Sequence, residues 1–166
     1  NWMTRIQPQG QDFRHYELVF RWYEAARRLG LDVDIVAPGQ ALDGYGLVLV
    51  PSLIHIDHRA EAALLNAKGQ VLYGPRTGSK TRHLSIPAEL PPGPIGKVLK
   101  TRVLEVASTR PGHVMKVKGK VNGTASRWRD VLETQADVLA RFEDGGAALI
   151  ASGNHHYLAC WPDEKL

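Results

Sequence analysis

A glycine-rich, basic turn at residues 74–81 has the best spacing for chemistry in this sequence. It follows the short apolar run 70–73 and reads Gly-Pro-Arg-Thr-Gly-Ser-Lys-Thr. In α/β proteins, a loop that leaves the C-terminal end of a strand is a usual place for a ligand. Two kinds of site fit such a loop: a cradle for nucleotide phosphates, and a strained turn that presents a nucleophile.

The phosphate cradle fails on its spacing. A Walker A loop has a glycine, four residues and then Gly-Lys-Ser/Thr, so that backbone N–H groups and the lysine surround the phosphates. Counted from Gly74, the second glycine should stand at the position of Ser79. The motif must also open a helix, which the prolines of residues 87–94 prevent. The sequence predicts no nucleotide site and no cofactor.

The nucleophile turn has the right frame and the wrong central residue. Its pattern is glycine, any residue, the nucleophile, any residue, glycine. Gly74 and Gly78 have this spacing, but the central residue is Arg76. A guanidinium is permanently charged and cannot attack a carbonyl group. The turn therefore keeps the frame of an active site without a reactive atom.

The other reactive side chains are scattered. His55 and His58 have the close spacing of metal ligands, but no second cluster completes such a site, so we expect surface histidines and no metal. Cys160 is the only cysteine and lies in an apolar run, which predicts a buried thiol and fits a reducing, cytoplasmic location. No two carboxylates have a spacing typical of acid–base catalysis.

Composition predicts one globular domain. The chain has 166 residues, of which 43% are hydrophobic and 23% charged. No apolar run approaches the roughly 18 residues needed to span a bilayer, so we expect no membrane partner. The net charge of +4 is weakly basic. The alternating lysines of residues 116–120 lack the interleaved aromatic residues of a nucleic-acid surface, so we expect no nucleic-acid partner.

Hydrophobic periodicity predicts an α/β arrangement in the first half. We expect a strand within the first ten residues, a helix over 13–29 with Asp12 as its N-cap, and a second helix over 57–68. Further strands are expected at 31–36, 47–50 and 71–73. The first helix should turn an aromatic stripe that includes Tyr16, Phe20 and Tyr23 toward the core, with Trp22 as an additional, exposed contact residue.

The second half is predicted to be β-rich. Short apolar runs alternate with turn-forming pairs such as Asn122-Gly123, which is typical of hairpins. These runs lie at residues 103–106, 114–118, 127–132, 137–142, 149–150 and 157–160. The proline-rich stretch 91–94 is the candidate seam, although the later strands should complete the same domain. Together the two halves predict an open, largely parallel sheet flanked by helices, with a β-rich C-terminal part.

Four segments in a fixed order carry a resemblance to one family. They are residues 2–23, 29–36, 50–53 and 74–81, and the likeness extends to 109–112 and 161–163. The sequence resembles the middle domain of the family 42 glycoside hydrolases, the bacterial β-galactosidases. This resemblance implies a flavodoxin-like fold, similar also to class I glutamine amidotransferases, with Arg76 standing where an amidotransferase has its cysteine.

The resemblance implies a non-catalytic trimerisation domain. The family's two catalytic glutamates act by a retaining mechanism in a preceding (β/α)8 barrel, and no residue here matches them. The implied partners are that barrel and two further copies in a homotrimer. Residues 1–166 are then a single domain excised from the middle of a cytoplasmic enzyme that hydrolyses terminal β-D-galactosides.

Two alternatives stay open at this point. A stand-alone amidotransferase-like hydrolase would use Cys160 or Ser79, and a binding module would hold a sugar or an anion through Arg76 and Lys80. If the domain serves assembly, the candidates for binding or interface contacts are Arg76, Lys80 and Trp22. Arg76 is expected to be a partly buried anchor that is paired with a carboxylate or a carbonyl group.

Overall fold

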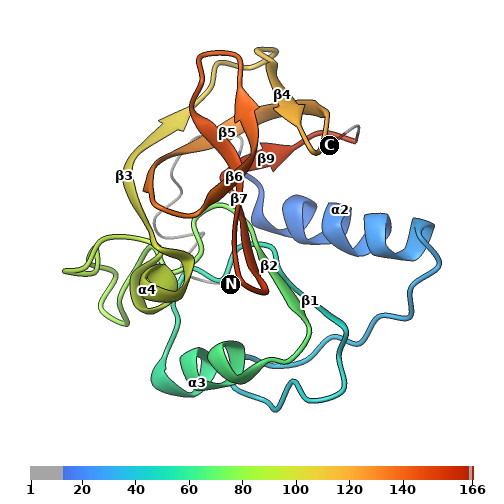
Figure 1. Ribbon diagram of the computed structural model, residues 1–166, viewed down its shortest axis with the longest axis vertical. Coiled ribbons are helices and arrows are strands. Elements are labelled where there is room, and N and C mark those ends of the chain that lie inside the picture. Colours follow the sequence, from blue (N-terminus) through green and yellow to red (C-terminus); the bar gives the residue numbers. More distant parts are fainter. Residues whose placement is uncertain (1–12, 165) are drawn as a thin grey trace.

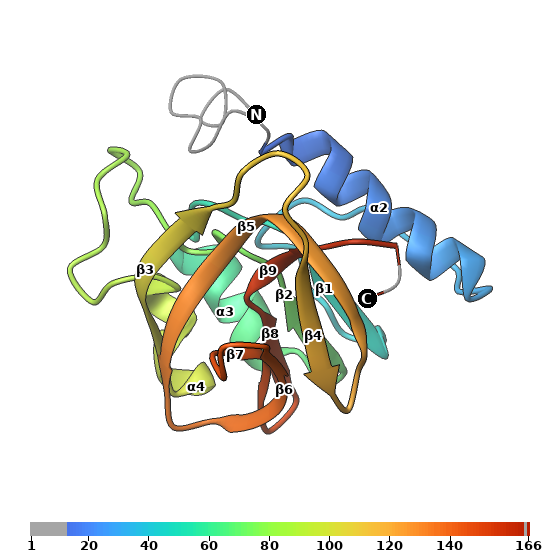
Figure 2. The same ribbon diagram turned by 90° about the horizontal axis from the view of Figure 1, so that it is seen from above.

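One mixed sheet forms the centre of the molecule (Figures 1 and 2). The computed structural model describes residues 13–164 and 166. Within this part, nine strands pair in the order β1-β2-β8-β7-β6-β4-β5-β3, and β9 pairs with β5. The strands are β1 (Leu47–Val50), β2 (Gln70–Tyr73), β3 (Thr101–Ser108), β4 (Met115–Gly119), β5 (Gly123–Thr134), β6 (Asp137–Phe142), β7 (Ala147–Ser152), β8 (His155–Leu158) and β9 (Cys160–Pro162).

The described helices are α2 (His15–Arg28), α3 (His58–Asn66) and the short α4 (Gly96–Leu99), which the 3-10 turn η1 (Gly93–Ile95) precedes. The positions expected for α2 and α3 are confirmed. Asp57 caps α3, because its carboxylate accepts hydrogen bonds from the backbone N–H groups of Arg59 and Ala60 at 3.0 and 2.8 Å. The strand expected in the first ten residues and the cap expected at Asp12 lie outside the described residues.

The expectation of a largely parallel sheet is wrong, because most of the described strand pairings are antiparallel. Only β1, β2 and β8 are parallel to one another, and the other described pairings are antiparallel. Parallel strands require long crossovers, whereas the short connections from β4 to β5, from β6 to β7 and from β7 to β8 place consecutive strands side by side and antiparallel. The β-rich C-terminal part is confirmed. Its strand β8 returns to pair with β2, which joins the two halves in one sheet.

Residues 31–36 do not form the strand that their alternation predicts. Leu31 and Ile35 are exposed, Ile35 by 89%. A strand is stable only when a neighbouring strand satisfies its backbone, and no described strand lies beside this segment. Instead, side chains hold it: Tyr45 Oη donates to Asp34 Oδ2 at 3.0 Å, and Arg27 Nη1 donates to the carbonyl of Leu31 at 2.9 Å.

The core lies in two layers, one on each face of the sheet. In the first, Leu64 of α3 and Leu99 of α4 belong to the same buried cluster as Tyr73 of β2. In the second, Trp22 of α2 belongs to the same buried cluster as Trp128 of β5. Both clusters contain residues from before and after the proline-rich stretch 91–94.

The helix α2 buries a different face from the one that we predicted. Its buried residues are Leu18, Trp22 and Ala26, whereas Tyr16, Phe20 and Tyr23 are 66%, 60% and 38% exposed. The helix carries two apolar stripes, and the one with Trp22 faces the sheet because the indole packs onto Gly74. A Cβ atom on that glycine would lie 2.9 Å from Trp22 Cζ2. The exposed position expected for Trp22 is therefore wrong, and its exposed fraction is 7%.

Candidate functional site

The turn after β2 has the strained geometry that a nucleophile turn requires. Two backbone hydrogen bonds fix it, from Gly74 N–H to the carbonyl of Val50 and from Gly78 N–H to that of Leu53, at 2.9 and 2.8 Å. Its central residue, Arg76, has a φ of 64°, a left-handed conformation that is uncommon for any residue other than glycine. No helix follows the turn, because residues 79–92 form turns and loops. The geometry of an active turn is thus present, but its central side chain is a guanidinium.

The Arg76 side chain points into the core. The residue is 3% exposed, and its Cζ lies 4.6 Å from the ring centroid of Phe13 and 5.3 Å from that of Trp128. Aromatic faces attract a cation most strongly where water is excluded. The buried position expected for Arg76 is observed.

Asp130 of β5 provides the opposite charge. This residue is 1% exposed, and its carboxylate accepts three hydrogen bonds. Trp128 Nε1 donates to Oδ1 at 2.8 Å, while Tyr157 Oη and the backbone N–H of Arg76 donate to Oδ2 at 2.7 and 3.3 Å. A buried carboxylate is stable only with such donors. We call Arg76, Asp130, Trp128, Tyr157 and Phe13 the buried charge cluster.

Burial and charge act in opposite directions in this cluster. Burial lowers the pKa of Arg76 to about 10, and the negative charge of Asp130 opposes this change. Burial likewise raises the pKa of Asp130, which its three donors and the positive charge of Arg76 counteract. Arg76 therefore stays protonated at neutral pH, and the two opposite charges lie together in the interior of the domain.

A second polar pair lies between the parallel strands. Tyr73 Oη and His155 Nδ1 are 3.0 Å apart, and the two rings stack with an interplanar angle of 6°. Burial raises the pKa of the Tyr73 phenol and lowers the pKa of the His155 imidazole. The phenol is thus the donor, and the neutral imidazole accepts through Nδ1. Sequence reasoning missed this pair because the two residues are 82 positions apart.

We expect His155 to make stability depend on pH. Because its pKa is lowered in the folded state, unfolded chains bind the proton first as the pH falls below about 6.5. The free energy of unfolding should therefore decrease from that pH downward, and a His155→Gln variant should lose this part of the decrease. Urea denaturation between pH 5 and pH 8 measures both proteins. His156→Gln is the control on the same strand, and equal slopes for His155→Gln and the unchanged chain would contradict the expectation.

The remaining candidates do not form a reactive site. Cys160 is fully buried, and burial raises the pKa of its thiol, so the thiolate nucleophile is disfavoured. The Oγ atom of Ser79 is buried and has no hydrogen-bond partner. His55 Nδ1 lies 3.2 Å from the carbonyl of Lys80, whose side chain is half-buried, and His58 is exposed at the start of α3. Among the described residues, no three His, Cys, Asp or Glu side chains gather as a metal site would require.

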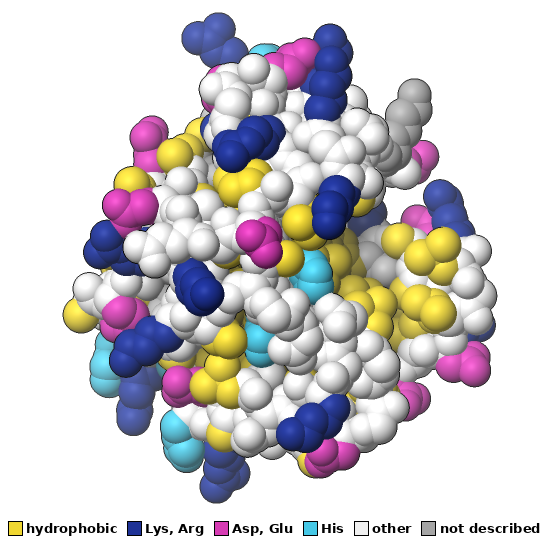
Figure 3. All heavy atoms as spheres, in the orientation of Figure 1, with side chains coloured by type: hydrophobic (Ala, Val, Ile, Leu, Met, Phe, Trp, Pro, Cys, Tyr) yellow, Lys and Arg dark blue, Asp and Glu magenta, His cyan; other side chains and the backbone are white. Residues whose placement is uncertain are grey.

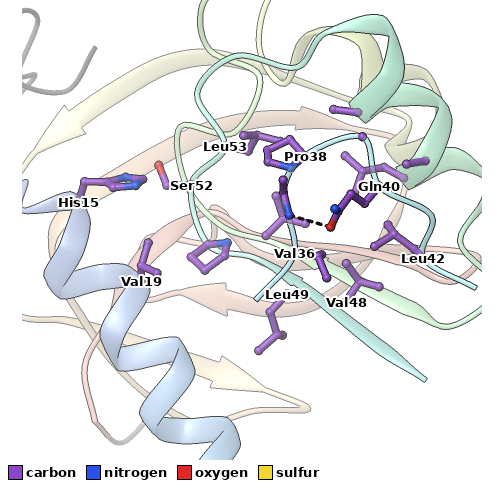
Figure 4. A pocket seen from close by; sticks show the side chains of 17 residues that line it. His15, Val19, Val36, Pro38, Gln40, Leu42, Val48, Leu49, Ser52 and Leu53 are labelled. Carbon is purple, nitrogen blue, oxygen red and sulfur yellow. Dashed lines mark hydrogen bonds between the residues drawn. The ribbon is translucent and has the colours of Figure 1, made fainter. Parts of the chain in front are cut away.

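A groove of about 310 Å³ lies between α2 and β1 (Figure 4). Val19 of α2, Val48 and Leu49 of β1, and Val36 are among the apolar residues that line it. Two polar side chains, those of His15 and Ser52, lie at one end. Ser52 Oγ and His15 Nδ1 are buried and have no hydrogen-bond partner. Sequence reasoning gave no sign of this groove.

The family model described as "Beta-galactosidase trimerisation domain" matches residues 1–166. A β-galactosidase of Thermus thermophilus is 43% identical over 166 residues, which are 99% of this chain and 26% of that protein. The β-galactosidase BgaH of Haloferax lucentense is 28% identical over 180 residues, with 99% of this chain and 27% of that protein covered. The chain thus spans about a quarter of the length of these relatives.

Solved structures agree in fold. A crystal structure of a β-galactosidase from the psychrophilic Marinomonas ef1 has a TM-score of 0.94 at 35% identity, covering 98% of this chain and 25% of that one. The enzyme from the haloarchaeon Halorubrum lacusprofundi has a TM-score of 0.90 at 27% identity, with 98% and 26% covered. In the described part of our structure, no helix is long and apolar enough to cross a membrane. The family match and these likenesses confirm the resemblance seen in the sequence: the chain belongs to the family of β-galactosidase trimerisation domains.

Proposed function

We propose that this domain holds a longer polypeptide in a homotrimer, and that the assembled enzyme hydrolyses terminal β-D-galactosides in a (β/α)8 barrel elsewhere in that polypeptide. The observation that carries the proposal is the family match over residues 1–166, together with relatives four times as long. The chemistry of the turn supports it, because its central side chain is the buried guanidinium of Arg76.

The purified chain should therefore be inactive by itself. We expect no turnover of a chromogenic β-galactoside above background, because the cysteine thiol of this chain is buried and its pKa is raised, and the proposal places the catalytic carboxylates in the barrel. The longer enzyme assayed at the same molar concentration is the positive control. Turnover by the chain that a point substitution within it abolishes would contradict the proposal.

The outer face of α2 is the surface that we propose for the contact between copies. Phe20 and Tyr23 lie side by side, with ring centroids 6.3 Å apart, and both are exposed. Figure 3 shows hydrophobic side chains gathered on and beside α2, where the surface is hollowed. Monomeric proteins seldom expose aromatic side chains in a group, and aromatic residues dominate the energetics of protein interfaces.

Charge introduced on this face should dissociate the trimer. We expect the longer enzyme carrying both Phe20→Glu and Tyr23→Glu to sediment as a monomer, because desolvating two carboxylates in an apolar contact is costly. The matched control is Arg28→Glu, which changes the net charge of the same exposed helix by the same two units and should remain a trimer. Sedimentation of the double variant as a trimer would remove α2 from the interface.

The candidate contact residues change in role under this proposal. Arg76 and Trp22 act from inside the domain, and the half-buried Lys80 remains a candidate contact with the barrel. We also propose that residues 1–166 are one middle domain whose fold is flavodoxin-like and similar to that of class I glutamine amidotransferases. The parallel strands β1, β2 and β8 and the positive φ of Arg76 support this. The fully buried, unpaired Cys160 supports a cytoplasmic location.

A further inference from the structure

The outer face of β4 carries lysines that the proposed function does not use. Lys116 and Lys118 are exposed, whereas Val117 between them is buried, because successive side chains of a strand point to opposite faces. Lysines are typical of an unpaired edge strand, where their charge prevents further pairing. However, β4 is an interior strand, since it pairs with β5 on one side and with β6 on the other. Protection of an edge therefore does not explain these lysines.

A second cation lies directly opposite Lys118. The register pairs Lys118 of β4 with Arg141 of β6, so the two exposed side chains share one face of the sheet, with Cβ atoms about 5 Å apart. Like charges that face each other across strands destabilise a sheet, whereas opposite charges stabilise it. The pair of cations is thus a local cost without a benefit inside the domain. Positions that break a local rule of the fold are commonly functional.

Acidic side chains within the domain leave these two cations uncompensated. Among the described residues, no carboxylate forms an ion pair with Lys118 or Arg141. The carboxylate of Glu143 pairs with Lys116 instead, Oε1 to Nζ at 3.3 Å. Arg141 Nη1 donates to the carbonyl of Gly145 at 2.8 Å, which orients the guanidinium but does not cancel its charge. A local excess of positive charge favours contact with an acidic surface.

We propose that Lys118 and Arg141 together bind a carboxylate of the next copy of the longer polypeptide in the trimer. A carboxylate fits the planar fork of an arginine, and the lysine adds a second positive charge beside it. The chain has no Asp or Glu in residues 106–129, so this surface would repel its own counterpart on another copy. A ring of three copies is built from contacts between two different patches, which allows a basic patch to meet an acidic one.

The position of β4 supports a contact between copies. Val117 of β4 and Trp22 of α2 belong to the same buried cluster. In Figures 1 and 2, β4 and α2 lie in the same half of the molecule, and Figure 1 shows β4 at the top, away from α3 and α4. The outer face of α2 is the surface proposed above for the contact between copies. A copy that contacts α2 therefore lies on the side of the molecule from which Lys118 is accessible.

Reversing the charge of Lys118 should weaken the trimer without weakening the domain. In the longer enzyme carrying Lys118→Glu, the concentration at which half of the trimer dissociates should rise at least about tenfold, because two carboxylates then face each other. Within the domain, the same change places opposite charges across β4 and β6, so a damaged fold does not account for the loss. Sedimentation over a series of concentrations measures the effect. Lys118→Arg should keep the trimer, and Lys68→Glu, exposed just after α3, is the control for net charge.

Chemical labelling identifies where the carboxylate comes from. Acetic anhydride acetylates free lysine side chains, and peptide mass spectrometry gives the rate at each lysine. In the longer enzyme, Lys118 should react more slowly in the trimer than in the monomer obtained by dilution, because the ion pair forms only between copies. Lys68 should react at the same rate in both forms.

Three outcomes would overturn the proposal. An unchanged dissociation of Lys118→Glu would mean that no carboxylate of the next copy faces this position. Equal labelling of Lys118 in trimer and monomer would assign the face to solvent, if fast, or to the barrel of the same polypeptide, if slow. Binding of single-stranded DNA that Lys118→Glu abolishes would assign it to nucleic acid. The contact rests on the trimer of the proposed function. A longer enzyme that is monomeric without any substitution would refute that function, whereas a trimer insensitive to Lys118→Glu refutes only the contact.

Discussion

Replacing Arg76 by alanine is expected to lower the free energy of unfolding by about 3 kcal/mol. The change leaves the fully buried carboxylate of Asp130 without its nearby cation, and it removes a guanidinium that lies against Phe13 and Trp128. Urea denaturation of the purified chain measures the loss. The expectation depends on burial, since the same truncation at a solvated arginine costs little.

Two further variants separate the side chain from the backbone. Arg82→Ala, at an exposed position of the same loop, should change stability by less than about 0.5 kcal/mol. Arg76→Gly should be less harmful than Arg76→Ala by up to about 1 kcal/mol, because glycine adopts a φ of 64° without strain. If Arg76→Ala and Arg82→Ala cost the same, Arg76 is not an anchor.

Replacing Gly78 by alanine is expected to cost roughly 3 kcal/mol or more, from left-handed strain of about 1–2 kcal/mol and overpacking of about 1–3 kcal/mol. Its φ is 63°, and an added Cβ would lie 1.9 Å from the carbonyl oxygen of Pro92. The three nearest atoms all belong to the backbone of Pro92, so no flexible side chain could move aside. The effect should appear as a lower midpoint in urea denaturation with an unchanged slope.

Gly153 is the matched control for this substitution. It has a similar φ of 61°, but nothing lies within 4 Å of the Cβ position. Gly153→Ala should therefore cost only the conformational part, roughly 1–2 kcal/mol. Equal costs at the two glycines would mean that the contact between the turn and Pro92 adds nothing to stability.

Local sequence pattern predicted the positions of most helices and strands, but it did not predict which elements would pack or pair with one another. The helix α2, the strand β1 and the later hairpins follow from periodicity, which depends on neighbouring residues only. The face that α2 buries depends on Gly74, 52 positions after Trp22, and no helical period contains that information. The failure of residues 31–36 has the same origin, since alternation describes a strand but does not supply its neighbour.

The sequence predicted the turn that forms the candidate site, but not the residues that contact its central side chain. The spacing of Gly74, Arg76 and Gly78 gave the turn and the burial of Arg76, because a cation in such a turn needs a partner. Asp130 could not be found from the sequence, since it lies 54 positions away on β5 and nothing in its local sequence marks it. The pair of Tyr73 and His155 was missed for the same reason.

The pairing of β2 with β8 has a consequence for the order of folding. The second neighbour of β2 consists of residues 155–158, so one edge of β2 stays open while about eighty intervening residues are synthesised. Contacts between such distant segments are slow to form, and an unpaired apolar edge is prone to aggregate in the meantime. A chain ended at Gly153 would retain β1, β2 and both of the longer helices, yet the position between β2 and β7 would be empty. The first half of this domain therefore cannot complete its native sheet until residues 155–158 have been synthesised.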